Sequence, residues 1–481
     1  MTIPIPPGVF DITPSSNESW ATSHLWNYLE SVLRDVAKDY GYQEIRTPIF
    51  ERTELFQRGV GSTTDIVSKE MYTFTDKGDR SLTLRPEGTA PVIRSYIDHG
   101  MAQTAPIQKL FYIGPMFRYE RAQAGRYRQH HQFGVEAIGI ANPEQDAEII
   151  DMVFTLYERL GLTNLKVGLN SIGNKACREA FKEKLCAYLE LYKNDLSKDS
   201  QQRLISNPLR ILDSKDPKDK EIVANAPSIL DFLDEECREH FETVCKLLNN
   251  LKIPYEINPL LVRGLDYYNK TVFEITAGEL GAQNSIAGGG RYDGLLKTLG
   301  GQDLPTVGFA TGLERVIQTM LKQEVPIPPA PSPQLFIIPL GNDAREKCFS
   351  LVHDVRQHGI AAQMELSGKK LGKAMQLANQ LGARYTVVIG ENELSQNEVE
   401  LKDMSDGTST KVPLHSLGKI LNLEKKSFEI IKLWQEMDIP YHDQKEKDFF
   451  MQKLSESLQK TSRLSTGLQT AVKEIKEILE M

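Results

Sequence analysis

The sequence predicts a multidomain α+β protein, and the order of its segments supports this fold class. Strand-like stretches before residue 140 and again at 255–315 flank a segment, 174–250, that is rich in Lys, Glu, Leu and Cys and has helical periodicity. A proline-rich stretch, 323–334, then precedes a region in which strand and helix patterns alternate. We therefore expect a sheet domain interrupted by a helical insertion, followed by a smaller α/β domain.

Length and composition agree with a globular protein of several domains. The chain has 481 residues, and at roughly 150 residues per domain this suggests about three domains. The formal charge of −8 argues against a surface that coats nucleic acid, but it allows a local basic patch. The N-terminus has no signal-peptide pattern, and no stretch of about 20 apolar residues occurs. We expect a soluble cytoplasmic protein.

The five cysteines form no CxxC pair, and no His/Cys cluster has the spacing of metal ligands. His130 and His131 are adjacent on a predicted strand and would point to opposite sides, so shared metal ligation is not expected. Sparse cysteines of this kind are typical of small buried residues in a reducing compartment. The sequence therefore predicts no metal site.

Several elements can be placed from the pattern. A helix is expected over 19–40, ending at Gly41, and a hairpin turn at Lys77-Gly78-Asp79 is followed by a helix that opens near residues 86–89. In the α/β region a helix is predicted at 370–381. The segment 426–481 carries apolar residues at steps of three and four. It is either an amphipathic helix packed on its own protein or a partner-binding or short coiled-coil helix.

The loop "FRYERAQAGRYRQHHQ" joins two predicted strands and contains four Arg and one Glu between Arg118 and Arg128. A solvated charged run is the usual explanation for such a loop. Here the arginines flank Gly125 and Tyr127, which suits a flexible loop that presents guanidinium groups to phosphates beside an aromatic ring able to stack on a base. We interpret the loop as a phosphate site.

Two further motifs each have an ordinary and a functional interpretation. Glu87 in "TLRPEGT" is either a helix cap or a carboxylate that holds a ligand's ammonium group. In "VGFATGLERV", Arg315 lies one turn after Gly312 in a predicted helix. It is either a surface residue or part of an anion site at the helix N-terminus. The three glycines of "SIAGGGRYDGL", Gly288, Gly289 and Gly290, mark either a plain turn or a close approach of the backbone to a ligand.

The stretch "LVRGLDYYNKTVFEI" places Arg263 next to Asp266, Tyr267 and Tyr268 before a predicted strand. A strand end needs no guanidinium, whereas a site for phosphate or carboxylate does. Together with "PIPPGVFDITP", the arginine-rich loop, "VGFATGLERV" and "SIAGGGRYDGL", this stretch resembles the class II aminoacyl-tRNA synthetases, and among them the histidyl-tRNA synthetases. The resemblance covers about 1–425, with Ala122 where the family often has Pro.

The resemblance implies a six-stranded antiparallel catalytic sheet with flanking helices, a C-terminal anticodon-binding α/β domain, and a homodimer. The expected organisation is a first catalytic half with motifs 1 and 2 (1–173), a helical insertion (174–250), a second catalytic half with motif 3 (251–322), a linker (323–334), the anticodon-binding domain (335–425) and a helical extension of unknown role (426–481).

The resemblance also implies the reaction. Histidine and ATP give histidyl-adenylate and pyrophosphate, and the terminal adenosine of tRNA(His) then accepts the histidyl group. Arg118 and Arg315 would hold the α- and γ-phosphates, and Arg263 would lie between the histidine carboxylate and the α-phosphate. The residues that the resemblance implies for ATP binding are Arg118, Glu120, Arg126, Tyr127 and Arg315. Mg²⁺ would enter with the ATP phosphates and not in a protein cage.

The histidine set implied by the resemblance is Glu87, Thr89, Gln132, Glu136, Tyr267 and Tyr268. Glu136 and Tyr268 would address the two ring nitrogens, which need different partners, and Glu87 and Gln132 would hold the ammonium group. Two other interpretations stay open. A regulatory paralogue from histidine biosynthesis would lack the C-terminal domain, and an RNA-binding sensor would have lost Arg263 or the motif arginines, yet the sequence has all of these.

Overall fold

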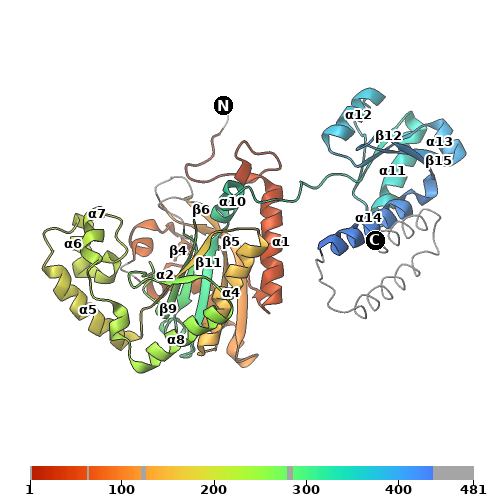
Figure 1. Ribbon diagram of the computed structural model, residues 1–481. Coiled ribbons are helices and arrows are strands. Elements are labelled where there is room, and N and C mark those ends of the chain that lie inside the picture. The colour runs from red at the N-terminus through yellow and green to blue at the C-terminus, as the bar shows by residue number, and fades with distance from the viewer. Residues whose placement is uncertain (1–2, 62–63, 121–125, 279–284, 437–481) are drawn as a thin grey trace, which may run out of the picture. The chain divides into compact units, whose positions relative to one another are not determined.

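The structure, a computed structural model, describes residues 3–61, 64–120, 126–278 and 285–436. It contains two compact units, Met1–Pro329 and Ala330–Met481, and the division between them falls inside the proline-rich stretch (Figure 1). Most of the predicted C-terminal extension lies outside the described residues. The finer domain boundaries stay predictions.

The first unit is organised by one sheet with strand order β1-β5-β6-β11-β10-β9-β7-β8. The six inner strands pair only in antiparallel fashion, and the two edge strands β1 and β8 add parallel pairs. The predicted fold class is confirmed, with two short parallel edge strands beyond the six expected. The strands are β1 (Gln43–Glu44), β5 (Gln108–Phe117), β6 (Gln129–Ile138), β7 (Leu165–Ser171), β8 (Tyr255–Ile257), β9 (Asn269–Ala277), β10 (Ser285–Arg291) and β11 (Thr306–Gly312).

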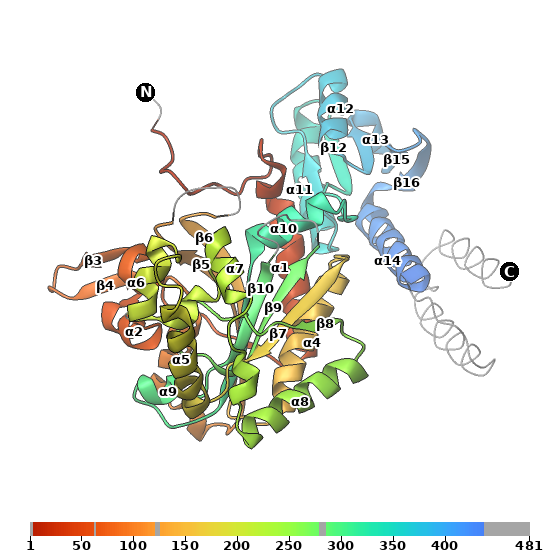
Figure 2. The same ribbon diagram turned by 60° about the vertical axis from the view of Figure 1, so that its left-hand side comes forward.

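One face of this sheet is covered by four helices, and apolar residues fill the space between them and the strands. Phe133, Val135 and Ala137 alternate along β6 toward this core, which leaves the intervening residues on the opposite face. Helix α8, the last helix of the inserted segment, packs on α4 and so belongs to the layer that covers this sheet (Figure 2). The helices are α1 (Ser23–Asp39), α4 (Pro143–Arg159), α8 (Glu235–Asn250) and α10 (Leu313–Lys322).

The opposite face carries a second apolar cluster that includes the helices of the inserted segment. A small sheet, in the order β2-β4-β3, lies in the same unit, and its β3–β4 turn falls at the predicted Lys77-Gly78-Asp79. These elements are α2 (Thr53–Gly59), α3 (Thr89–Asp98), α5 (Lys175–Glu190), α6 (Lys198–Ser206), α7 (Pro217–Val223), α9 (Leu295–Thr298), β2 (Phe50–Arg52), β3 (Thr73–Thr75) and β4 (Ser81–Leu84).

The predicted N-terminal helix is interrupted at its start. A 3₁₀ turn, Ser19–Ala21, precedes α1, and Thr22 has the extended backbone of a helix cap. The Trp26 indole N–H donates to the Trp20 carbonyl oxygen at 2.9 Å and holds the two pieces together. The interruption reflects a tertiary contact that helical periodicity does not encode.

The second unit is a five-stranded sheet in the order β13-β12-β14-β15-β16, flanked by helices. Its predicted helix at 370–381 is present as α12, while the edge strand β16 has no counterpart in the sequence prediction. In the described part of the chain, no helix is both long and apolar enough to span a membrane. The elements are β12 (Leu335–Pro339), α11 (Asn342–Gln357), β13 (Ala362–Met364), α12 (Leu371–Gln380), β14 (Tyr385–Ile389), α13 (Glu391–Gln396), β15 (Glu398–Asp403), β16 (Ser409–Pro413) and α14 (Leu417–Glu436).

Candidate active site

A polar cavity of about 500 Å³ opens over the sheet at strands β6, β10 and β11. Its size suits a nucleotide with a small second ligand. It brings together residues that lie far apart in the sequence and that the sequence singled out: Arg118, Glu120, Arg126, Tyr127, Gln132, Arg263, Gly288 and Arg315. The inserted segment also reaches this cavity, through Asp213 and Lys215.

Arg263 lies on the loop that precedes β9, and its guanidinium group faces the cavity. Its Nη1 donates to Glu274 Oε2 at 3.0 Å, while its Nε is buried without a partner among the described residues. A Cβ at residue 288 would collide with this guanidinium group, so the glycine makes room for Arg263. The cation is therefore held in one place with donors left for an anionic ligand.

The other cavity arginines are also fixed by the protein. Arg118 Nε donates to the Pro86 carbonyl oxygen at 2.8 Å, and Arg315 Nη1 donates to the Ser285 carbonyl oxygen at 2.6 Å. Arg126 forms an ion pair with Glu120 at 2.9 Å. These arginines all line the cavity, and a guanidinium group carries five N–H donors of the kind that bind phosphate oxygens.

Residue 314 secures the start of α10, and with it Arg315. The buried carboxylate of Glu314 accepts from the His131 backbone N–H at 2.8 Å and lies 2.9 Å from His131 Nδ1. His130, on the other side of β6, lines the cavity. Burial, with Arg118 nearby, lowers the pKa of His130 to about 3, so this ring is neutral at neutral pH.

Glu136 lies on the same face of β6 as Gln132; it is completely buried and is not among the residues that line the cavity. Thr89 Oγ1 donates to Glu136 Oε1 at 2.8 Å, and the hydroxyl of Tyr292 donates to Oε2. Burial raises the pKa of Glu136 to about 8, although both hydrogen bonds act in the opposite direction. On the paired strand, Gly308 leaves the space that Oε2 occupies.

The remaining histidine-set residues surround this carboxyl group. Tyr267 and Tyr268 are stacked at 4.7 Å between ring centroids, and burial raises the pKa of each hydroxyl. Glu87 is bound by its own helix, since both of its oxygens accept backbone N–H groups, from Thr89 and Ala90, at 2.8 Å. Glu87 therefore caps the start of this helix, as the first of its two interpretations predicted.

Gln132 differs from Glu87, because its Oε1 is buried without a partner among the described residues. This oxygen is available to accept an N–H from a ligand. Tyr127 lines the cavity and also packs on the protein: its ring centroid lies 4.9 Å from that of Phe10 and 5.0 Å from that of Trp20, and its hydroxyl accepts from Gln318 Nε2 at 3.1 Å. The preceding loop residues, 121–125, lie outside the described residues.

The three consecutive glycines lie inside strand β10, so the turn interpretation is wrong for them. Sequence reasoning also missed two partners of the site. Tyr292 lies two residues after the last of these glycines, and the available signal was a polar hydroxyl beside a glycine-rich strand. Glu274 occupies a partly buried position in β9, and its charge within an apolar strand pattern was the corresponding signal.

Comparison with known proteins identifies the family. The family model described as histidyl-tRNA synthetase matches residues 21–316, and the anticodon-binding domain model matches 334–423. The chain belongs to the histidyl-tRNA synthetase family. Among curated relatives, the histidine–tRNA ligase of Protochlamydia amoebophila is 63% identical over 422 residues, covering 88% of this chain and 100% of that protein.

Two further relatives agree with this assignment. The histidine–tRNA ligase of Desulfitobacterium hafniense (strain DSM 10664 / DCB-2) is 47% identical over 421 residues, covering 88% of this chain and 98% of that protein. The apo histidyl-tRNA synthetase of S. aureus has a solved structure with a TM-score of 0.74 and 40% identity, covering 88% of this chain and 100% of that chain.

In this synthetase the inserted segment supports the loop that carries Arg263. Arg210 Nη1 donates to the Gly264 carbonyl oxygen at 3.2 Å, and Asn207 Nδ2 donates to Asp266 Oδ1 at 3.0 Å. Arg178 donates to the Tyr268 carbonyl oxygen from the same side. The position of the cavity cation therefore depends on contacts with helical residues that are distant in sequence.

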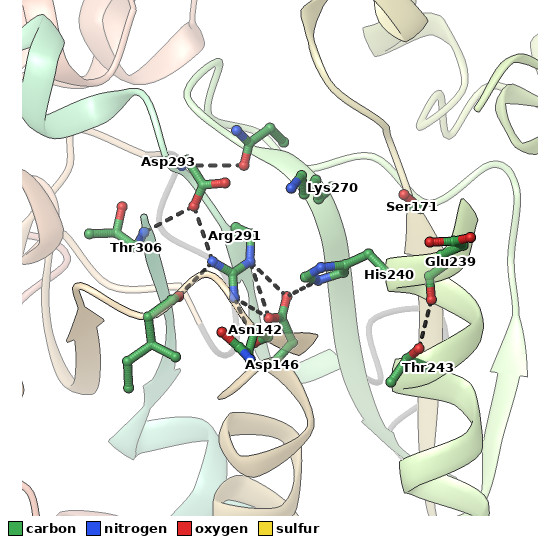
Figure 3. A network of polar contacts seen from close by, with 12 residues as sticks. Asn142, Asp146, Ser171, Glu239, His240, Thr243, Lys270, Arg291, Asp293 and Thr306 are labelled. Carbon is green, nitrogen blue, oxygen red and sulfur yellow. Dashed lines mark hydrogen bonds and ion pairs between the residues drawn. The ribbon is translucent and has the colours of Figure 1, made fainter. Parts of the chain in front are cut away.

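A buried ion pair fixes the end of β10 next to Tyr292 (Figure 3). Arg291 is fully buried, forms a bidentate pair with Asp146 of α4, and donates to the Ile140 and Asn142 carbonyl oxygens. His240 of α8 lies 3.3 Å from Asp146. Burial alone would raise the pKa of Asp146, but His240 and Arg291 together hold it below its usual value. Arg291 is therefore a structural residue and faces no ligand.

We expect Asp146→Asn to destabilise the catalytic unit by about 3–5 kcal/mol, because it leaves the Arg291 charge buried without its partner. Urea unfolding followed by tryptophan fluorescence measures the change. The double variant Asp146→Leu/Arg291→Met should recover much of the loss, because neither charge then stays buried alone. A double variant at least as unstable as Asp146→Asn would contradict the ion-pair explanation.

The same pair predicts a pH dependence. The pKa of Asp146 is lower in the folded chain than the value of about 3.9 expected when unfolded, so its contribution to stability is complete above that value. It is lost as the pH falls through the folded-state pKa. Wild-type stability should therefore fall below about pH 4 more steeply than that of the double variant.

Proposed function

We propose that this chain is a histidine–tRNA ligase that activates L-histidine with ATP and transfers it to the 3′-terminal adenosine of tRNA(His). Its membership of the histidyl-tRNA synthetase family supports the assignment. The observation that carries it in the structure is Arg263, held by Glu274 at the wall of a nucleotide-sized cavity over the sheet that also carries the buried Glu136.

In the activation step, Arg263 lies between two anions that must approach each other, the histidine carboxylate and the ATP α-phosphate. Its planar cation reduces their repulsion and stabilises the charge that grows at the α-phosphate as pyrophosphate leaves. Glu274 fixes the orientation of the guanidinium group. Arg118 and Arg315, on the same cavity, bind the α- and γ-phosphates.

Selection of histidine rests on the buried polar group of β6. Glu136 accepts from one ring nitrogen and Tyr268 addresses the other. Thr89 and Tyr292 hold the Glu136 carboxyl group in position. An amino acid without ring nitrogens would leave Glu136 with only its Thr89 and Tyr292 hydrogen bonds in a buried site, and loss of such a polar contact can give discrimination of order 10⁴–10⁵ without editing.

The histidine ammonium group requires acceptors on the same side. Gln132 has an unsatisfied buried oxygen and is the stronger candidate, and Glu87, bound to its helix N-terminus, supplies negative charge. Burial raises the pKa of Glu87, with its helix N–H bonds acting in the opposite direction. An ammonium ligand would stabilise its charged form.

Partners follow from the same proposal. ATP would bring Mg²⁺ on its phosphates, and Glu120 and Glu274, carboxylates on the cavity wall, are the oxygen donors that such an ion accepts. The anticodon-binding match at 334–423 supports tRNA(His) as the macromolecular substrate. A cytoplasmic homodimer, with Tyr127 and Arg126 near the ATP and the acceptor end, completes the proposal.

ATP–pyrophosphate exchange measured with each of the twenty amino acids tests this function. We expect exchange with histidine alone, because only its ring satisfies both Glu136 and Tyr268. A reaction without amino acid provides the background. Exchange with a different amino acid, or none with histidine in the presence of ATP and Mg²⁺, would contradict the proposal.

A further inference from the structure

A cluster of metal-ligating side chains lies outside the residues that line the cavity, where the inserted segment leaves and rejoins the catalytic body. Among the residues that the structure describes, Cys177, Asp234 and Cys237 place two sulfur atoms and a carboxylate oxygen within 4.8 Å of one another. Cys177 belongs to the first turn of α5 and Cys237 to the first turn of α8. Both cysteines are buried and free, and Asp234 is exposed.

The two halves of the cluster have the same local structure. Asn174 caps α5 and accepts from the Cys177 backbone N–H at 3.1 Å, and Asp234 caps α8 and accepts from the Cys237 backbone N–H at 2.9 Å. Asn174 Nδ2 also donates to Asp234 Oδ2 at 2.6 Å, which joins the caps. A cap followed three residues later by a cysteine thus occurs twice, and the two turns face each other.

Backbone N–H groups also point at the sulfur atoms across the junction. The Asp234 N–H donates to Cys177 Sγ at 3.3 Å, and a backbone hydrogen bond from Asn174 acts on Cys237. Burial nonetheless raises the pKa of the Cys237 thiol to about 12, so a metal ion bound here would release that proton. Neither sulfur takes part in the chemistry proposed above, and the two cysteines pack with Leu230 and Leu233 in a small apolar cluster.

We propose that Cys177, Cys237 and Asp234 bind one Zn²⁺ ion that joins the two ends of the inserted segment. Two thiolates and a carboxylate are a donor set that zinc accepts, whereas Mg²⁺ and Ca²⁺ take oxygen ligands. Tetrahedral geometry with Zn–S bonds of about 2.3 Å puts the sulfur atoms roughly 3.7 Å apart, which is compatible with ligand atoms that all lie within 4.8 Å of one another. Water fills the fourth position, since Asp234 opens the site to solvent.

The site could not be recognised in the sequence, because neither of the two turns that form it contains a pair of cysteines. The pattern is Asn-x-x-Cys at one end and Asp-x-x-Cys at the other, about sixty residues apart. An ion here closes the segment between α5 and α8, whose Asn207 and Arg210 support the Arg263 loop. The predicted role of the ion is therefore to hold the insertion in place.

Metal analysis of the full-length chain tests the proposal. The protein is reduced, equilibrated with Zn²⁺ alone, desalted and measured for bound zinc. We expect about one Zn²⁺ per chain in the wild type and in Cys245→Ser, a partly buried cysteine on the same helix, and less than about 0.1 in the double variant Cys177→Ser/Cys237→Ser. Equal zinc content in wild type and double variant would refute the site, as would a wild type without zinc.

Two measurements keep the test decisive if the double variant fails to fold. Co²⁺ bound to the wild-type chain should show a sulfur-to-cobalt charge-transfer band that Zn²⁺ displaces, and a spectrum with oxygen and nitrogen ligands only would overturn the proposal. Asp234→Asn keeps an oxygen that can cap α8 but removes the charge. It should lower zinc affinity by about tenfold or more, and unchanged affinity would exclude Asp234 as a ligand.

Discussion

Replacing Arg263 with alanine is expected to lower the rate of histidyl-adenylate formation by about 10³-fold, while histidine affinity falls much less. The guanidinium group acts mainly on charge that develops at the α-phosphate, and removal of such groups typically costs this much in rate. ATP–pyrophosphate exchange at saturating histidine and ATP measures the first quantity. Equilibrium binding of histidine measures the second.

Two variants serve as controls for Arg263. Arg159→Ala removes an arginine whose ion pair with Asp39 lies at the surface, and it should leave exchange unchanged. Arg263→Lys keeps the charge but not the planar fork that Gly288 accommodates, so it should recover only a small part of the rate. Exchange at the wild-type rate in Arg263→Ala would rule out the proposed position between the two anions.

The second large effect is expected for Glu136→Gln, which should raise the KM for histidine by about 10²-fold and leave the KM for ATP within about threefold of wild type. Accepting from the ring N–H favours the charged form of Glu136 in the histidine complex, where a buried hydrogen bond to a charged group contributes about 1.5–3 kcal/mol, and glutamine has nearly the same shape. Steady-state exchange with each substrate varied in turn measures both constants. Equal changes in the two constants would argue against Glu136 as the ring reader.

Stability against pH gives an independent check on the same variant. Burial raises the pKa of Glu136 to about 8 in the folded chain, compared with about 4.3 when unfolded. The folded state therefore binds more protons between these values, and wild-type stability decreases as the pH rises through this range. Glutamine does not titrate, so the variant should gain stability relative to wild type between pH 5 and pH 8. An unchanged difference would show that Glu136 is charged throughout.

The elements around the site were largely predictable because their signals are local. Period-two alternation in β6 places Gln132 and Glu136 on one face, and the turn residues near Gly78 fix the β3–β4 hairpin. The motif resemblance added the family and the candidate site residues. The cavity contains the predicted Arg118, Arg263 and Arg315.

Other features depend on pairings that no local pattern encodes. The sequence allowed Glu87 to be either a helix cap or a ligand for an ammonium group, and the structure shows the helix cap. It also marked the glycines of β10 as room for a ligand or as a turn. The structure instead gives the space at Gly288 to the Arg263 guanidinium group, and the turn interpretation fails because the glycines pair with both neighbouring strands.

The sequence by itself determined the fold class, the family and the types of residue proposed for catalysis, because hydrophobic periodicity and short motifs are local features of a sequence. Tertiary structure decided which of these groups meet. Tyr292 forms a hydrogen bond with Glu136, and Asp146 forms an ion pair with Arg291. The two helix-capping turns that each carry a cysteine also come together at the ends of the insertion. These contacts join residues tens to hundreds of positions apart, and strand register and helix packing, not local preference, bring such residues within bonding distance.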